Sequence, residues 1–177
     1  MRIGSTIVAL AAAWTASLEP AWAIAGCDVF TNALRAGASD MEVEFGRAVV
    51  VSRTRSDSIV FDVTTSVDVD ATLTCRGDQF QRFEARISQP ANARTTTNFE
   101  RFQAAALKAA LGWDAGKSRG VMRGMSADAT EYLAASRERG DVYVAGKTEE
   151  HEPGGVSLGL IATGSDRTFV IVGPAGQ

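Results

Sequence analysis

The residues best suited to acid–base or metal chemistry lie in one short segment around the only histidine of the chain. Glu149, Glu150, His151 and Glu152 are consecutive, and a Pro-Gly-Gly turn sequence follows them. An imidazole oriented by a carboxylate can act as a general base, and carboxylates with an imidazole can bind a divalent metal ion. However, the chain has no second histidine to complete a zinc site, and adjacent side chains of an extended segment point in opposite directions. We interpret this segment as a solvated loop between two strands, and we predict no metal site and no cofactor.

A second group of candidate residues lies between two predicted helices, from Trp113 to Gly124. Gly116-Lys117-Ser118 has the ending of a phosphate-binding loop, but that motif needs a glycine where this chain has Leu111, and it follows a strand rather than a helix. We therefore interpret the segment as an interhelical loop. Trp113 and Lys117 join His151, Glu149 and Glu150 as candidate binding residues, and the sequence predicts no catalytic residue.

The first 23 residues predict an export signal. A positive start at Arg2 is followed by an apolar stretch from Ile3 to Leu18 and by Ala21-Trp22-Ala23, the small-x-small pattern of a signal peptidase site. We expect cleavage after Ala23 and a periplasmic or secreted location. The apolar run is too short for a transmembrane helix, which needs roughly 20 apolar residues, so the mature chain is expected to lack a membrane span.

Two cysteines, Cys27 and Cys75, remain after this cleavage. An isolated cysteine pair in an exported protein is usually a disulfide, and only one pairing is possible here. A competing hypothesis reads Ile24 to Cys27 as a lipobox, with Cys27 acylated and the protein anchored to a membrane. That hypothesis would leave Cys75 as a free thiol in an oxidising compartment, and we favour the disulfide.

Charge composition argues against several classes of partner. The chain has 18 Lys and Arg against 21 Asp and Glu, a formal net charge of -3 at pH 7, and no basic run. Nothing resembles the basic stripe that neutralises phosphates in a nucleic-acid binder, so no nucleic-acid partner is expected. The mature length suits one domain, covering residues 24–177.

Alternating apolar and polar residues predict strands on both sides of a helical region. The clearest case is the segment ending at Cys75, in which Val67, Val69, Ala71 and Leu73 alternate with polar residues. Matching its apolar face to that of the next strand requires an odd number of loop residues, so we expect Arg76-Gly77-Asp78 as the loop, with Ala71 opposite Phe83. The predicted strands are Glu42–Ser52, Ser58–Thr65, Val67–Cys75, Gln79–Ser88, Asp141–Lys147, Val156–Thr163 and Thr168–Gly173.

Two helices are predicted between these strand groups. The first is Asn98–Leu111, with Thr97 and Glu100 as a capping box and Gly112 as its end. The second runs from Ser126 to Arg139. A short helix at Asp28–Arg35 is a weaker expectation. Aromatic residues at helical spacing, such as Phe99 and Phe102, are read as core rather than pocket.

The order of these elements predicts an α+β domain. We expect an antiparallel sheet of about six to seven strands with two helices packed on one face, in the order β-meander, α, α, β-β-β, stapled by one disulfide. The leading functional hypothesis is an exported, non-catalytic binding or interaction domain that uses its exposed sheet face or the Trp113–Gly124 loop. Its partner would be an envelope or extracellular protein or a small ligand. The alternative is a small hydrolase or lyase using His151 with Glu149 or Glu150, which requires His151 to lie in a cleft near a carboxylate and an arginine.

Overall fold

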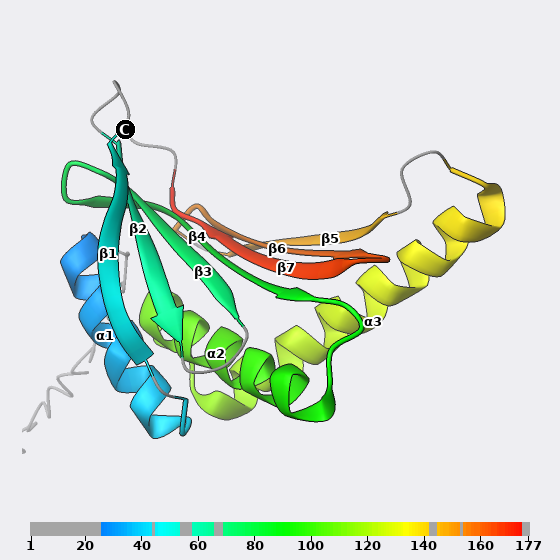
Figure 1. The fold of residues 1–177 in the computed structure, drawn as a ribbon, viewed down its shortest axis with the longest axis horizontal. Coiled ribbons are helices and arrows are strands. Elements are labelled where there is room, and N and C mark those ends of the chain that lie inside the picture. Colours follow the sequence, from blue (N-terminus) through cyan, green and yellow to red (C-terminus); the bar gives the residue numbers. More distant parts are fainter. Residues whose placement is uncertain are drawn as a thin grey trace, which may run out of the picture.

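The computed structural model shows one antiparallel sheet with helices on one side of it (Figure 1). It describes residues 26–43, 45–53, 58–65, 69–141, 145–152 and 154–174, and for 45–53 and 58–65 it describes the backbone alone. The predicted signal segment, residues 1–23, and the expected cleavage site after Ala23 lie outside the described residues.

The described residues form three helices and seven strands, which lie in the sheet in the order β1-β2-β3-β4-β7-β6-β5. Every neighbouring pair of strands is antiparallel. The α+β class and the antiparallel sheet are therefore confirmed. The elements are α1 (Cys27–Asp40), β1 (Phe45–Arg53), β2 (Ser58–Thr65), β3 (Asp70–Arg76), β4 (Gln79–Ser88), α2 (Ala93–Leu111), α3 (Ala115–Arg139), β5 (Ala145–Glu152), β6 (Val156–Thr163) and β7 (Asp166–Val172).

The predicted number of helices is wrong, because a third helix covers the sheet. The segment expected as a short helix forms the 14 residues of α1, which buries Phe30 and Leu34 and packs against α2. The Phe30 ring lies 4.7 Å from that of Phe80 and 5.4 Å from that of Phe83 on β4, measured between centroids. The sheet face over β1 to β4 needs this cover, which two helices do not supply.

Helices α2 and α3 both begin earlier than predicted. The N-cap of α2 is Asn92, whose side chain accepts a hydrogen bond from the Thr95 amide, so the expected capping box at Thr97 lies inside the helix. The N-cap of α3 is Asp114, whose carboxylate accepts from the Lys117 amide over 2.8 Å, so the helix starts at Ala115 and not after Ser126. The predicted Trp113–Gly124 loop is therefore mostly helix.

The register between β3 and β4 differs from the predicted one. Ala71 pairs with Ala85 rather than Phe83, and a two-residue turn at Gly77-Asp78 replaces the three-residue loop. An irregularity at Gln81 adds one unpaired residue to β4. Turn and bulge together supply the odd number that keeps the apolar side chains of both strands on one face.

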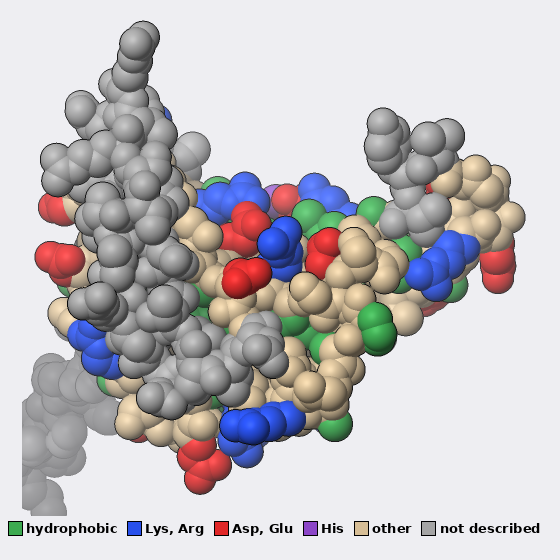
Figure 2. Space-filling view, viewed as in Figure 1, with side chains coloured by type: hydrophobic (Ala, Val, Ile, Leu, Met, Phe, Trp, Pro, Cys, Tyr) green, Lys and Arg blue, Asp and Glu red, His purple; other side chains and the backbone are tan. Residues whose placement is uncertain are grey.

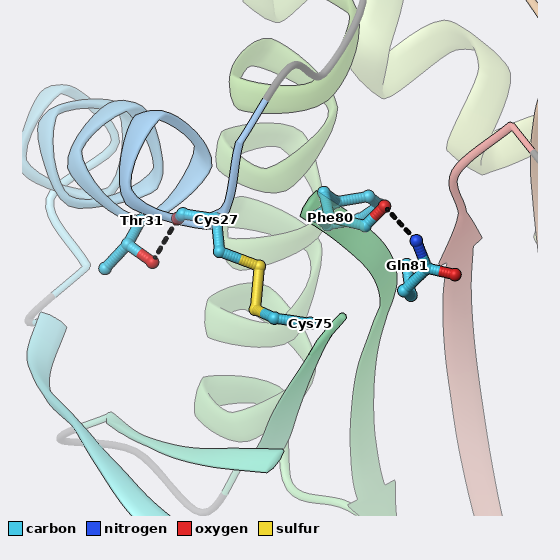
Figure 3. Close-up of a disulfide and its surroundings, with 5 residues drawn as sticks. All are labelled: Cys27, Thr31, Cys75, Phe80 and Gln81. Carbon is cyan, nitrogen blue, oxygen red and sulfur yellow. Dashed lines mark hydrogen bonds between the residues drawn. A yellow bond between two sulfur atoms is a disulfide. The ribbon is translucent and has the colours of Figure 1, made fainter. Parts of the chain in front are cut away.

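The disulfide between Cys27 and Cys75 is confirmed, with Cα atoms 6.2 Å apart (Figure 3). It joins the first residue of α1 to the end of β3, and the Cys27 amide also donates a hydrogen bond to the Asp78 carbonyl. Both cysteines are buried. The bond thus ties α1 to the covered face of the sheet.

Helix α3 approaches β5 so closely that only glycine fits between them. A Cβ atom at Gly146 would overlap the backbone carbonyl of Ala129 on α3. Ala129 is fully buried at this contact, whereas Gly120 and Gly124 on the same helix face open space. None of the helices that the structure describes is long and apolar enough to span a bilayer.

We expect Gly146→Ala to lower the free energy of unfolding by about 1–3 kcal/mol, because the added methyl group forces α3 away from β5. Gly124→Ala is the matched control, since it should raise stability by about 0.5–1 kcal/mol through helix propensity alone. Guanidinium denaturation measures both. A Gly146→Ala protein as stable as the wild type would show that the two elements are not in backbone contact.

The Cys27→Ala/Cys75→Ala double variant should lose about 4 kcal/mol of stability, the loop-closure entropy of a disulfide that spans 48 residues. Urea denaturation of this variant and of the oxidised wild type gives the difference. The reduced wild type is the control and should match the double variant. Equal midpoints for the oxidised and reduced proteins would contradict the assignment.

Candidate ligand-binding cleft

A cleft of about 590 Å³ lies between α2, α3 and the covered face of the sheet. Its walls come from the first half of α2 and the middle of α3, and its floor comes from β4, β6 and β7. The lining residues are Ile87, Thr96, Phe99, Glu100, Gln103, Arg119, Met122, Arg123, Ser126, Ala127, Thr130, Leu160 and Arg167.

The deepest part of the cleft is apolar. Ile87, Phe99, Met122 and Leu160 are each at most 5% exposed. Ile87 and Leu160 come from the sheet, while Phe99 and Met122 come from the two helices. The interpretation of Phe99 and Phe102 as core residues is confirmed, and Phe99 in addition forms part of the cleft wall.

Gln103 is the one buried polar side chain in the lining, at 3% exposed. It lies one turn after Phe99 on α2, in the row that faces α3 and the sheet. None of the hydrogen bonds found among the described residues involves its amide, and its neighbours in the lining are largely apolar. Ser118 Oγ, and not the Gln103 amide, is the fully buried side-chain polar atom without a partner among the described residues, so the amide of Gln103 reaches the cleft and offers donors and an acceptor to its occupant.

Polar and charged side chains line the rest of the cleft. Arg119 and Arg123 lie one turn apart on α3, and Glu100 lies on α2. Arg167 reaches the cleft from β7 and donates a hydrogen bond from Nη1 to Ser126 Oγ over 3.2 Å. The cleft therefore combines an apolar interior with several hydrogen-bond donors, the usual composition of a small-molecule site.

The acidic segment around His151 is not a loop, which corrects the sequence interpretation. It forms the second half of β5, where His151 pairs with Ser157 of β6 and its Nδ1 lies 2.9 Å from Ser157 Oγ. Glu149 shares the exposed face with His151 and its carboxylate is 3.3 Å from Lys147 Nζ, while Glu150 points to the opposite face. The three candidates do not converge, and none lines the cleft.

Trp113 and Lys117 are brought together, but outside the cleft. Trp113 follows α2 and is 8% exposed, and Lys117 Nζ lies 3.9 Å from its ring centroid. This cation–π contact links the residue after α2 to the first turn of α3. Among the described residues no group of three or more His, Cys, Asp and Glu side chains is arranged to hold a metal ion.

The face of the sheet opposite the helices carries charges of both signs. Arg82 lies 2.7 Å from Glu84, and Arg86 lies 3.6 Å from Asp70, measured between nitrogen and carboxylate oxygen. Blue and red side chains accordingly alternate around β3 and β4 in Figure 2, without a large region of one sign. These four charges are exposed and paired, so the described side chains of β3 and β4 on this face present no concentrated field of one sign.

The Trp113–Gly124 segment, proposed from the sequence as a binding surface, contributes Arg119 and Arg123 to the cleft, but the sequence analysis named none of the polar lining residues individually. Arg167 falls between the predicted strands Val156–Thr163 and Thr168–Gly173, and Arg119 and Arg123 fall in the predicted Trp113–Gly124 loop. A signal for Arg167 was present, since it falls two residues before Phe169 and four before Ile171 in an alternating strand. Extending the predicted strand by two residues would have placed this arginine among inward-facing apolar residues.

Comparison with protein-family models, curated protein sequences and solved structures finds no match. The function is therefore argued from the contacts of this chain itself.

The burial of Gln103 predicts an unusual effect on stability. Gln103→Leu should raise the free energy of unfolding by about 1 kcal/mol, because an amide without a protein partner is replaced by an apolar group of similar size. Thermal unfolding followed by circular dichroism measures the change. Gln79→Leu, at an exposed strand end, is the control and should alter stability by less than about 0.5 kcal/mol. A destabilised Gln103→Leu protein would mean that the amide is satisfied within the fold.

Proposed function

We propose that this protein is an exported, non-catalytic binding module and that its ligand site is the cleft between α2 and α3. The observation that carries the proposal is the cleft itself. Its volume of about 590 Å³ lies within the range of roughly 300–1,000 Å³ that small-molecule sites occupy. Its walls are apolar and a few polar groups converge on it, so it is suited to a small organic ligand.

The disulfide supports export by the cleaved-signal route over the lipid-anchor hypothesis. The sulfur of Cys27 is bonded to Cys75, so the same atom is not available for the thioether of a lipid anchor. A disulfide also persists in an oxidising compartment and is rare in the cytosol. A periplasmic or secreted location fits both points.

The hydrolase or lyase hypothesis receives less support than binding. It requires His151 in a cleft beside a carboxylate, whereas His151 is exposed on β5 and contacts Ser157. The nearest carboxylate along that face, Glu149, is paired with Lys147. A general base of this kind needs an orienting carboxylate and a place for the substrate, and among the described residues His151 neither contacts a carboxylate nor lines the cleft.

A large side chain at the mouth of the cleft should weaken the binding of an apolar probe. We expect the neutral fluorophore N-phenyl-1-naphthylamine to bind the wild type, and Ala127→Trp to weaken that binding by about tenfold or more, equivalent to 1.4 kcal/mol. Ala127 lines the cleft and is exposed, so the new indole occupies the mouth without disturbing the core.

The matched control is Ala134→Trp, an exposed position two turns further along α3 and outside the cleft. It should bind the fluorophore as the wild type does. Fluorescence titration gives both constants. Failure of the wild type to bind the probe, or equal loss in both variants, would remove the cleft as the ligand site.

A further inference from the structure

Arg167 occupies a position at which the sheet otherwise presents apolar side chains to the helices. Phe169, two residues further along β7, is fully buried on the same face. The residues that pair with Arg167 across the sheet are Ile87 on β4 and Ala162 on β6, and both are buried. The guanidinium therefore lies on the covered face, where it lines the cleft and contacts Ser126.

This cation has no anionic partner in the part of the chain that the structure describes. No ion pair within 4 Å joins Arg167, Arg119 or Arg123 to a described acidic side chain, although Arg82 and Arg86 on the opposite sheet face are paired. The lining contains three arginines and one glutamate, Glu100, which leaves a net charge of +2. Arg167 is partly buried, whereas Arg119 and Arg123 are exposed at the edge of the cleft, so the cleft presents an excess of positive charge that an anionic ligand would balance.

The cations and the apolar floor share one cleft. Arg167 emerges from the floor next to Ile87, and Arg119 and Arg123 lie on the α3 wall beside Met122. A guanidinium forms short, charge-assisted hydrogen bonds to carboxylate or phosphate oxygens, and these strengthen where water is partly excluded. A ligand that fits both features has an anionic head group and an apolar tail.

We propose that the cleft binds a single-chain anionic amphiphile, with its head group held by Arg167, Arg119 and Arg123 and its chain on the apolar floor. This inference rests on the proposed function of the cleft as a ligand site. The buried amide of Gln103 supplies a further donor to the same ligand.

The preference for an anionic head group can be tested by competition. Dodecanoate and dodecanol, each below its micelle-forming concentration, are used to displace N-phenyl-1-naphthylamine from the cleft. The two probes have the same alkyl chain and differ in charge. Dodecanoate should bind about 10- to 100-fold more tightly than dodecanol, and added salt should narrow the difference. Acetate alone should not displace the fluorophore, because it lacks the chain.

Arg167→Gln should reduce the preference for dodecanoate over dodecanol to within about threefold. Arg86→Gln is the matched control, since Arg86 lies on the neighbouring strand but on the opposite face, and its preference should equal that of the wild type. Should Arg167→Gln fail to fold, the exposed double variant Arg119→Gln/Arg123→Gln tests the same charge.

The outcomes separate this inference from the function on which it rests. Fluorophore binding with equal displacement by dodecanoate and dodecanol would overturn the anionic head group and leave the cleft a ligand site. Displacement by acetate at the concentrations at which dodecanoate acts would also overturn it, in favour of a plain anion site. Absence of binding by the fluorophore and by both dodecyl probes would remove the binding function itself.

Discussion

The fold depends on covering one apolar face of a seven-stranded sheet. Strands β3, β4, β6 and β7 each present buried aliphatic or aromatic side chains to the same side, and three helices lie against them. Helix α1 is held by the disulfide and by the ring contacts of Phe30, α2 is buried along most of its length, and α3 is held against β5 by the close approach at Gly146. The cleft lies where α2 and α3 leave the sheet partly uncovered between them.

Helix α3 is held by different contacts near its start and in its second half. Near its start, Trp113 and the Asp114 cap hold it close to the end of α2. In its second half, the absence of a side chain at Gly146 brings it down onto the edge strand β5. Between these points the two helices separate, and Met122, Arg123 and Ser126 face the resulting space. The cleft therefore results from the divergence of α3 from α2.

Much of the architecture was predictable from the sequence because its signals are local. Alternation of apolar residues placed β2, β4 and β6 at their observed bounds, and the two glycines at positions 112 and 140 correctly ended α2 and α3. Helix starts were harder. Thr97 and Ser126 are good caps in isolation, but Asn92 and Asp114 cap the observed helices, because tertiary burial extends α2 and α3 beyond the region of clear amphipathic spacing.

The site could not be predicted in the same way, because its residues come from five elements that the sequence does not place side by side. The densest group of titratable side chains in the sequence, Glu149 to Glu152, does not converge, because adjacent residues of a strand point to opposite faces. The β3–β4 register was missed for a related reason, since the bulge at Gln81 leaves no mark in the alternation pattern. Arg167 differs from these cases, because the alternation of its strand, continued two residues toward the N-terminus, predicts that it lies on the covered face.

The strand order has a consequence for the sequence of folding events. The strands form two meanders, β1 to β4 and β5 to β7, and the hydrogen bonds between β4 and β7 are the backbone pairing that joins them. Within each meander the pairings are between neighbours in the chain, whereas the β4–β7 pairing must close a loop that contains both α2 and α3, and such long-range closure is slow. Ile87 and Arg167 face each other across that seam, so the cleft comes into existence only when the two halves of the molecule have joined. A ligand bound in the cleft would then contact residues on both sides of the β4–β7 pairing, and it should slow the separation of the two halves.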